Sequence, residues 1–178
     1  MIDEITKYDK SFNEATFLSK IDHMFIMILD AIMDNNIDNV KHYLSDNVYN
    51  ELNEMVSNYK NKNITRLFDE MNIKSTSINN VSVENNNLII NVYITTRYMD
   101  YFINEDGDYI SGINDHRIEK VHKVKLEKPI YSENLSEARR CNHCGKTLDI
   151  NMSGICPYCN QVIDIKDKEY IICDIDEI

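Results

Sequence analysis

The stretch "NNVSVENNNLIINVYITTRYMDYFINEDGDYISG", residues 79–112, decides the fold. It is rich in Val, Ile, Thr and Tyr, the residue types that favour strands. Between Leu88 and Tyr98, apolar or aromatic residues alternate with more polar ones, which is typical of a strand with one face on a core. The "ENNN" segment can turn the chain before Leu88, and Asp106-Gly107 is a tight-turn signal before a shorter returning strand.

A third strand is predicted in "HRIEKVHKVKLEKP", residues 116–129, with Val124 and Leu126 on one face and Pro129 at its end. Its lysines are typical of an edge strand, where charge prevents pairing with another sheet. The middle of the chain is therefore predicted to be an antiparallel meander.

The N-terminal third has the apolar spacing of helices. Ser11 and Glu14 form a capping-box pattern, so a helix is expected to begin there. A short helix should follow around Val40, and Ser45 or Asp46 can cap the next one. The apolar stripes of the two longer helices consist of Phe17, Leu18, Ile21, Met24, Phe25, Ile28, Leu29, Ile32 and Met33, and of Val48, Leu52, Met55, Val56 and Tyr59.

Helices followed by a meander predict an α+β fold, with the helices packed on one face of the sheet. We expect helices within residues 11–60 and the sheet from about Ile73. The C-terminal "EYIICDI" has strand character again, with Ile171, Cys173 and Ile175 on one face and Cys173 buried. This strand is expected to close the sheet behind an inserted cysteine module. The predicted division is a main domain over 1–135, an insertion over 136–161 and a closing strand over 162–178.

The inserted module, "CNHCGKTLDINMSGICPYCN" at residues 141–160, carries two C-x-x-C pairs. Gly145 and Asn160 follow the second cysteine of each pair, and both residue types tolerate a left-handed backbone. Such a turn can fold its N–H groups back onto the sulfurs. The two pairs therefore resemble two copies of one knuckle, with "DINMSG" as a hairpin turn between them. The predicted ligands of one Zn²⁺ are Cys141, Cys144, Cys156 and Cys159.

Four protein ligands leave no position for an activated water, so the zinc is expected to be structural. Two disulfides are an alternative, although nothing in the sequence points to export. A redox-active C-x-x-C pair is another, but the strand-to-helix context of such pairs is missing. His143 could replace one cysteine as a ligand.

The formal charge of -11 makes binding to nucleic acids and anionic lipids unfavourable without a separate basic patch. The main basic concentration is 120–128, together with Arg139, Arg140 and Lys146. No apolar run approaches the roughly 20 residues of a membrane span, and the N-terminus does not resemble a signal peptide. We therefore expect a cytoplasmic protein.

Other candidate sites have simpler readings. The "NEDGDYISG" stretch resembles a calcium loop, but Gly107 stands at the wrong position, which favours a hairpin turn. The histidines His23, His42, His116 and His122 lack metal-ligand spacing and are expected to be partly buried or at the surface. An acid–base site is conceivable along the strand that carries Tyr93, Arg97, Tyr98, Asp100 and Tyr101. Arg97 and Asp100, however, should face opposite sides of that strand.

Three segments resemble the Tim44-like family, named after the tether of the mitochondrial import motor, as found in bacterial zinc-ribbon proteins. They are "YDKSFNEATFLSKIDHMFIMILDAIMDNNIDNVKHYLSDNVYNEL", "INNVSVENNNLIINVYITTRYMDYFINEDGDYISG", and the cysteine stretch followed by "EYIICDI". The resemblance implies the curved-sheet cone of the nuclear transport factor two-like superfamily. It implies no catalytic residues. Better-known members bind anionic lipid and tether translocation partners, but this chain has no basic amphipathic helix.

The function expected from residues and resemblance together is that of a non-enzymatic binding or adaptor protein. Its cone would offer a pocket or groove to a peptide, lipid or protein partner, beside a zinc ribbon. Such an adaptor could act in transport or in a membrane-associated assembly, at the periphery of the membrane. The alternative is a small enzyme that uses the cone cavity through Arg97, Asp100 and the neighbouring tyrosines. A third interpretation, nucleic-acid binding through the ribbon, would depend on Arg139, Arg140 and Lys146. The sequence does not fix the oligomeric state.

Overall fold

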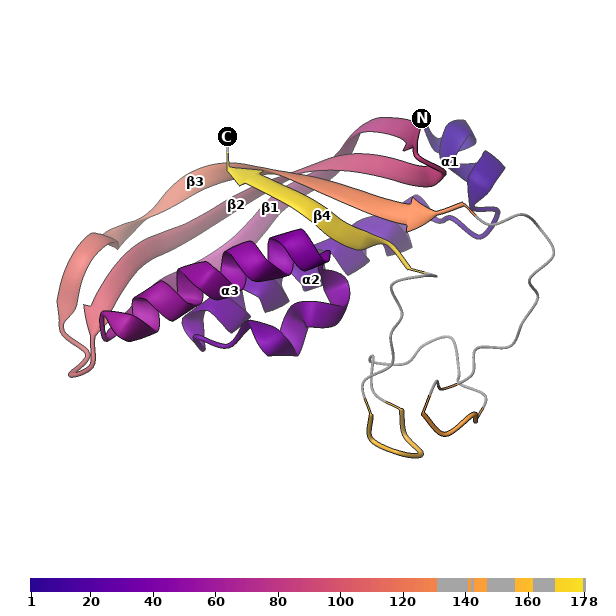
Figure 1. Ribbon diagram of the computed structural model, residues 1–178. Coiled ribbons are helices and arrows are strands. Elements are labelled where there is room, and N and C mark those ends of the chain that lie inside the picture. The colour runs from indigo at the N-terminus through magenta and orange to yellow at the C-terminus, as the bar shows by residue number, and fades with distance from the viewer. Residues whose placement is uncertain (131–140, 142, 147–155, 162–168, 178) are drawn as a thin grey trace.

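A curved antiparallel sheet with helices packed on one face forms the main body of the computed structural model (Figure 1). The structure describes residues 1–130, 141, 143–146, 156–161 and 169–177. Its elements are α1 (Ile2–Tyr8), α2 (Glu14–Met33), the 3₁₀ helix η1 (Ile37–Tyr43), α3 (Asp46–Asn61), β1 (Ile64–Glu84), β2 (Asn87–Asn104), β3 (Tyr109–Pro129) and β4 (Ile171–Glu177). The predicted α+β class is confirmed.

Helix α2 forms where its apolar stripe predicts, but its cap differs. The N-cap is Asn13, whose side chain accepts a hydrogen bond from the Thr16 N–H at 2.9 Å. The predicted cap, Ser11, instead donates its hydroxyl to Asp9 at 2.8 Å. Hydrogen bonds to a charged carboxylate are stronger than those between neutral groups, which favours the contact of the Ser11 hydroxyl with Asp9. The capping-box prediction at Ser11 is therefore wrong, because Asp9 engages that side chain and Asn13 caps the helix equally well.

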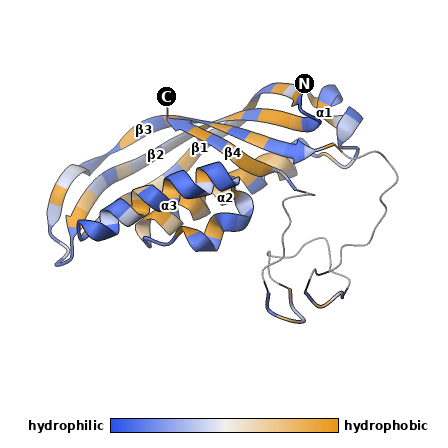
Figure 2. Cartoon of the chain, in the orientation of Figure 1, coloured by the Kyte–Doolittle hydropathy of each residue, from blue (hydrophilic) through white to orange (hydrophobic). Residues whose placement is uncertain are grey.

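The other helices include one that the sequence pattern did not indicate. Helix α1 contributes one buried residue, Ile5, to the core, too little for a visible stripe. The predicted short helix is present as η1. Ser45 caps α3 as expected and accepts from the Val48 N–H at 3.3 Å. Figure 2 shows that the outer side of α3 is hydrophilic.

The sheet has the order β1-β2-β3-β4 and is a meander, as predicted. It begins at Ile64, earlier than the expected Ile73. Charged residues such as Asp69 and Glu70 interrupt the apolar pattern of β1, so its start does not stand out in the sequence. Three register shifts also interrupt the pairing of β1 with β2. The turn between β1 and β2 is formed by Asn85 and Asn86, whose φ values of 49° and 64° are those of a tight hairpin turn.

Strand β3 is one continuous strand, whereas two shorter strands were expected. Tyr98 pairs with Ile118 and Asp100 with Ile113, so the residues in between bulge out of β3. Gly112 makes this possible, because it has a φ of +104° and an added Cβ would lie 2.4 Å from the Asp100 carbonyl oxygen. The second half of β3 lies between β2 and β4, so its lysines are not on an edge strand.

Strand β4 pairs antiparallel with β3 and closes the sheet. A register shift at Cys173 places Ile172 opposite Leu126 and Ile175 opposite Val124, so both isoleucines share the core side. The simple alternation predicted for this strand is therefore wrong. Cys173, expected to be buried, is half-buried, and its Sγ lies 3.4 Å from the Lys125 carbonyl oxygen. Burial raises the pKa of this thiol to about 11.

Candidate functional sites

Two features of the described chain have the geometry of a site: a cavity between the helices and the sheet, and the four-cysteine cluster. The cavity has a volume of about 160 Å³. Helices α2 and α3 line it with Phe25, Ile28, Leu29, Ile32, Leu52 and Met55. The sheet contributes Arg66, Phe68, Tyr98, His122, Ile175 and Glu177. The cavity therefore has an apolar helical wall and a wall on the sheet that includes polar groups.

His122 is a buried polar group of the sheet wall, with 5% of its surface exposed. Its Nε2 lies 3.1 Å from the Thr96 hydroxyl and 3.3 Å from the Tyr98 hydroxyl. Burial lowers the pKa of His122 to about 4, although the charge of Glu177 opposes this shift. The imidazole is therefore neutral at neutral pH, with one nitrogen that donates and one that accepts a hydrogen bond.

An ion-pair network lies beside His122. The Asp100 carboxylate accepts two hydrogen bonds from Arg66, at 2.8 and 2.7 Å, and a third from Lys120 at 3.3 Å. Lys120 also forms an ion pair with Glu177 at 2.6 Å. Burial alone would raise the pKa of Asp100, but Arg66 and Lys120 outweigh it and lower that pKa. Asp100 is thus held as a paired carboxylate.

The cysteine cluster is built from two turns with the same backbone bonds. The N–H of Cys141 donates to the Lys146 carbonyl at 2.9 Å, and the N–H of Gly145 donates to the Cys141 carbonyl at 2.8 Å. In the second turn, Cys156 donates to Gln161 at 2.9 Å and Asn160 to Cys156 at 2.8 Å. Gly145 and Asn160 have φ values of 70° and 56°. The prediction of two matching knuckles with left-handed residues is confirmed.

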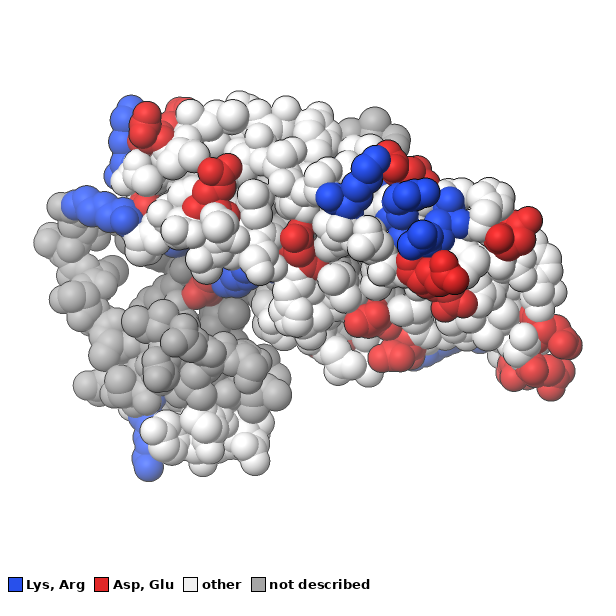
Figure 3. All heavy atoms as spheres, turned by 180° about the vertical axis from the view of Figure 1, so that it is seen from behind, with Lys and Arg blue, Asp and Glu red and all other residues white. Residues whose placement is uncertain are grey.

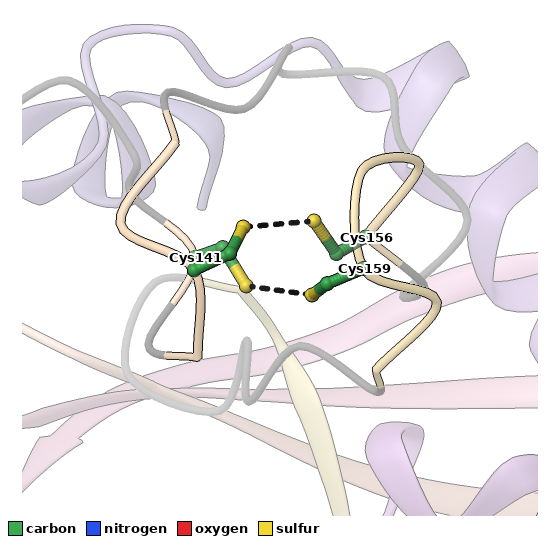
Figure 4. Close-up of side chains that lie close together, drawn as sticks. Cys141, Cys156 and Cys159 are labelled. Atoms are coloured by element: carbon green, nitrogen blue, oxygen red, sulfur yellow. Dashed lines mark hydrogen bonds between the residues drawn. The ribbon is translucent and has the colours of Figure 1, made fainter.

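The sulfur atoms face one another across the two knuckles (Figure 4). Cys141 Sγ lies 3.6 Å from Cys159 Sγ, and Cys144 Sγ lies 3.7 Å from Cys156 Sγ. All four lie within 4.8 Å of one another. Metal–sulfur bonds of about 2.3 Å in a tetrahedron separate the sulfurs by about 3.8 Å. The four cysteines could therefore hold a metal ion.

The local backbone also favours the deprotonated form of the Cys141 thiol. Backbone N–H groups of Cys144 and His143 hydrogen-bond to the Cys141 sulfur and lower its pKa to about 6, whereas burial and the neighbouring sulfurs raise the pKa values of Cys144 and Cys159. Metal coordination by cysteine requires the deprotonated form. His143 itself is exposed, and within the described residues the cluster consists of the four cysteines without it. The "DINMSG" turn predicted between the knuckles lies outside the described residues.

The Tim44-like domain model matches residues 1–138. The chain belongs to the Tim44-like domain family. No curated protein matches it. The matched part of this Tim44-like protein runs from α1 through β3 and ends just before Cys141, so it includes neither the cysteine cluster nor β4. The helices and curved sheet agree with the cone expected for this family.

The residues proposed for an acid–base site do not come together in the Tim44-like domain. Arg97 is exposed, and the partners of Asp100 are Arg66 and Lys120. Tyr98 is buried, and burial raises its pKa. The "NEDGDYISG" stretch forms the predicted hairpin turn, in which the Asn104 side chain accepts from the Asp108 N–H at 2.8 Å.

Sequence reasoning missed His122, Arg66 and Lys120 as members of one site. A signal for His122 was present, because it alternates with Val124 and Leu126 on the core side of the predicted strand. The sequence held no such signal for Arg66, because its stretch was not predicted to be a strand.

Among the described residues, none of the helices has the length and apolar character needed to span a membrane. Arg139 and Arg140 lie outside the described residues.

Proposed function

We propose that this Tim44-like protein is a non-enzymatic adaptor that binds a protein or peptide partner through the cone cavity. The observation that carries the proposal is the state of the polar groups in the cavity wall and of Asp100, which pairs with Arg66 of that wall. Asp100 is fixed in ion pairs, and His122 has a pKa of about 4, so neither is poised to exchange protons near neutral pH. A wall of this kind suits binding better than acid–base catalysis.

The adaptor role also agrees with the family. Tim44-like domains in general act as binding modules and not as enzymes. Basic side chains on the sheet lie beside acidic ones, as in the ion pairs Lys74–Glu119 at 2.9 Å and Arg117–Glu70 at 3.6 Å. Figure 3 shows blue and red side chains mixed on one face. This pattern supports a protein partner over a nucleic acid, because phosphate binding depends on unpaired positive charge.

We further propose that the four cysteines bind one structural Zn²⁺, and that the ribbon, over 136–161, is an insertion between the domain parts 1–135 and 162–178. Four thiolates at tetrahedral spacing fit zinc better than a hard cation such as Mg²⁺. The end of the family match before Cys141 and the pairing of β4 with β3 support an insertion. The zinc would supply folding energy to a module too small for a core of its own.

The adaptor proposal predicts that partner capture depends on the cavity. Capture from the native cell, with soluble and membrane fractions kept separate, would use the wild type, Met55→Trp and Glu54→Trp. Met55 lines the cavity, whereas Glu54 is exposed on the same helix. A protein retained by the wild type and Glu54→Trp and lost with Met55→Trp is the expected result. Equal capture by all three proteins would contradict the proposal, and the fraction that holds the partner tests the proposed cytoplasmic or peripheral membrane location.

A further inference from the structure

The size of the cavity limits what it can hold. Its volume is about 160 Å³. An apolar protein cavity of roughly 150 Å³ accommodates one benzene molecule. The cavity of this protein is therefore matched to a single six-membered ring and is too small to enclose a long acyl chain. Its half-buried members Leu52, Met55 and Ile175 mark the side from which a ligand would enter.

The walls favour an aromatic ring over an aliphatic group of the same size. Phe25 and His122 have ring centroids 4.7 Å apart, and Phe68 and Tyr98 have centroids 5.3 Å apart at an interplanar angle of 78°. All four rings line the cavity. Tilted and edge-to-face contacts at such distances are the preferred geometry between aromatic rings. A further ring in the cavity would meet both faces and edges.

The charges in the wall, at Arg66 and Glu177, are compensated by Asp100 and Lys120 beside it. Arg66 and Lys120 carry two positive charges, while Asp100 and Glu177 carry two negative ones. A charged ligand would bring an unpaired charge to a wall that has already paired its own, and desolvating such a charge is costly. The wall therefore selects a neutral ligand.

His122 supplies one hydrogen-bonding position for such a ligand. The Thr96 hydroxyl donates to the Lys120 carbonyl oxygen at 3.4 Å, so its oxygen can accept a hydrogen bond from the Nε2–H of His122. Nδ1 is then the acceptor of the neutral imidazole, and among the described residues none forms a hydrogen bond with it. Nδ1 can therefore accept a hydrogen bond from a hydroxyl group of the ligand.

We propose that the cavity binds a neutral, single-ring aromatic group of the phenol class, the chemistry of a tyrosine side chain of the protein or peptide partner, with its hydroxyl donating a hydrogen bond to His122. This inference rests on the proposed function, in which the partner binds through the cavity, and adds the chemistry of the group that enters it. The ring would lie among Phe25, Phe68 and Tyr98.

The test is a titration of the full chain followed by NMR of the isoleucine and methionine methyl groups. The probes are p-cresol, the charged rings benzoate and benzylamine, the ring without oxygen toluene, and the neutral acyl chain 1-octanol. We expect p-cresol to shift the methyl signals of Ile28 and Met55 and to bind at least about tenfold more tightly than either charged ring. Met55→Trp should abolish this binding, whereas Glu54→Trp should leave it intact.

A second variant tests the role of His122 and keeps the outcome independent of folding. The preference for p-cresol over toluene should be about three- to tenfold in the wild type and should disappear in His122→Phe, while toluene still binds. Binding of 1-octanol without p-cresol would overturn this inference but leave the cavity as a binding site. Failure of every probe would overturn this inference, whereas the proposed function would be overturned only by partner capture that Met55→Trp leaves unchanged.

Discussion

The contacts inside the main domain are of a different kind from those inside the cysteine module. The core of the main domain joins Ile5, Ile90 and Ile172, three residues that are distant in sequence and have 0% of their surface exposed. The described contacts of the module join only residues within 141–161, through backbone bonds and facing sulfurs. Burial of apolar surface stabilises a fold without a metal. Four clustered thiolates, in contrast, need a cation to balance their negative charges. The comparison therefore separates a domain with a core of its own from a module that, on the proposed zinc site, would depend on its ion.

The described residues on either side of the module are attached to the main domain. Asp9, with 8% of its surface exposed, accepts hydrogen bonds from Lys128 at 2.7 Å and from the Tyr170 hydroxyl at 3.0 Å. Lys128 precedes the insertion and Tyr170 follows it. The Ile130 N–H also donates to the Asn86 carbonyl at 2.9 Å. The described chain on either side of residues 131–168 is thus fixed to the main domain.

The largest expected effect is the loss of the metal. Cys156→Ser should abolish zinc binding and remove the roughly 10–16 kcal/mol that zinc contributes to small modules. The unfolding transition of the main domain should not change. Zinc content by elemental analysis and denaturant unfolding by circular dichroism measure the two effects. Cys173→Ser is the control, because Cys173 lies outside the cluster and should retain one zinc per chain.

A substitution in the core should weaken the main domain and leave the cysteine module unchanged. Ile90 is fully buried in the core, so Ile90→Ala should lower the free energy of unfolding by about 2–5 kcal/mol. Zinc content should stay at one per chain. The control Ile110→Ala removes a side chain that is 47% exposed and should have little effect. A fall in zinc content that parallels the loss of stability would show that the two regions are coupled.

A smaller effect is expected where the two regions meet. Asp9→Asn should cost about 1–3 kcal/mol, because the variant loses hydrogen bonds to a charged group. Burial would raise the pKa of Asp9, but Lys128, Ser11 and Tyr170 outweigh it and lower that pKa. The folded chain then binds this proton less readily than the unfolded chain does. The contribution is therefore present above about pH 4 and is lost as the pH falls further. Unfolding measured from pH 6 to 3 should show this acid-dependent loss in the wild type and not in Asp9→Asn.

The smallest predicted effect is confined to one helix end. Asn13→Ala should lower the free energy of unfolding by about 1 kcal/mol, whereas Asn13→Gly should cost only a few tenths. Thermal unfolding with the zinc content held constant measures the difference. Equal losses for both variants would argue against Asn13 as the cap of α2.

Local patterns predicted the parts of this fold that depend on neighbouring residues. The stripe of α2, the alternation of β2, the Asn85–Asn86 turn and the two knuckles each express a preference of a short segment. Pairing between distant segments decided the rest. The start of β1 and the bulge of β3 depend on their register with β2, which no single segment encodes.

The candidate sites follow the same rule. The four cysteines lie in one stretch, so spacing alone brought them together. The cavity joins residues of α2, α3 and all four strands of the described sheet, and Asp100 meets Arg66 only through the pairing of β1 with β2. The sequence could therefore supply the candidate Asp100 but not its partner.

Hydrogen exchange of the full chain, followed by mass spectrometry with and without a zinc chelator, tests the separation of the two regions most directly. The account predicts faster exchange after zinc removal at the hydrogen-bonded amides of Cys141, Gly145, Cys156 and Asn160, with no change in β3 and β4. Equal loss of protection in Ile171–Glu177, or no change in the cysteine module, would contradict it.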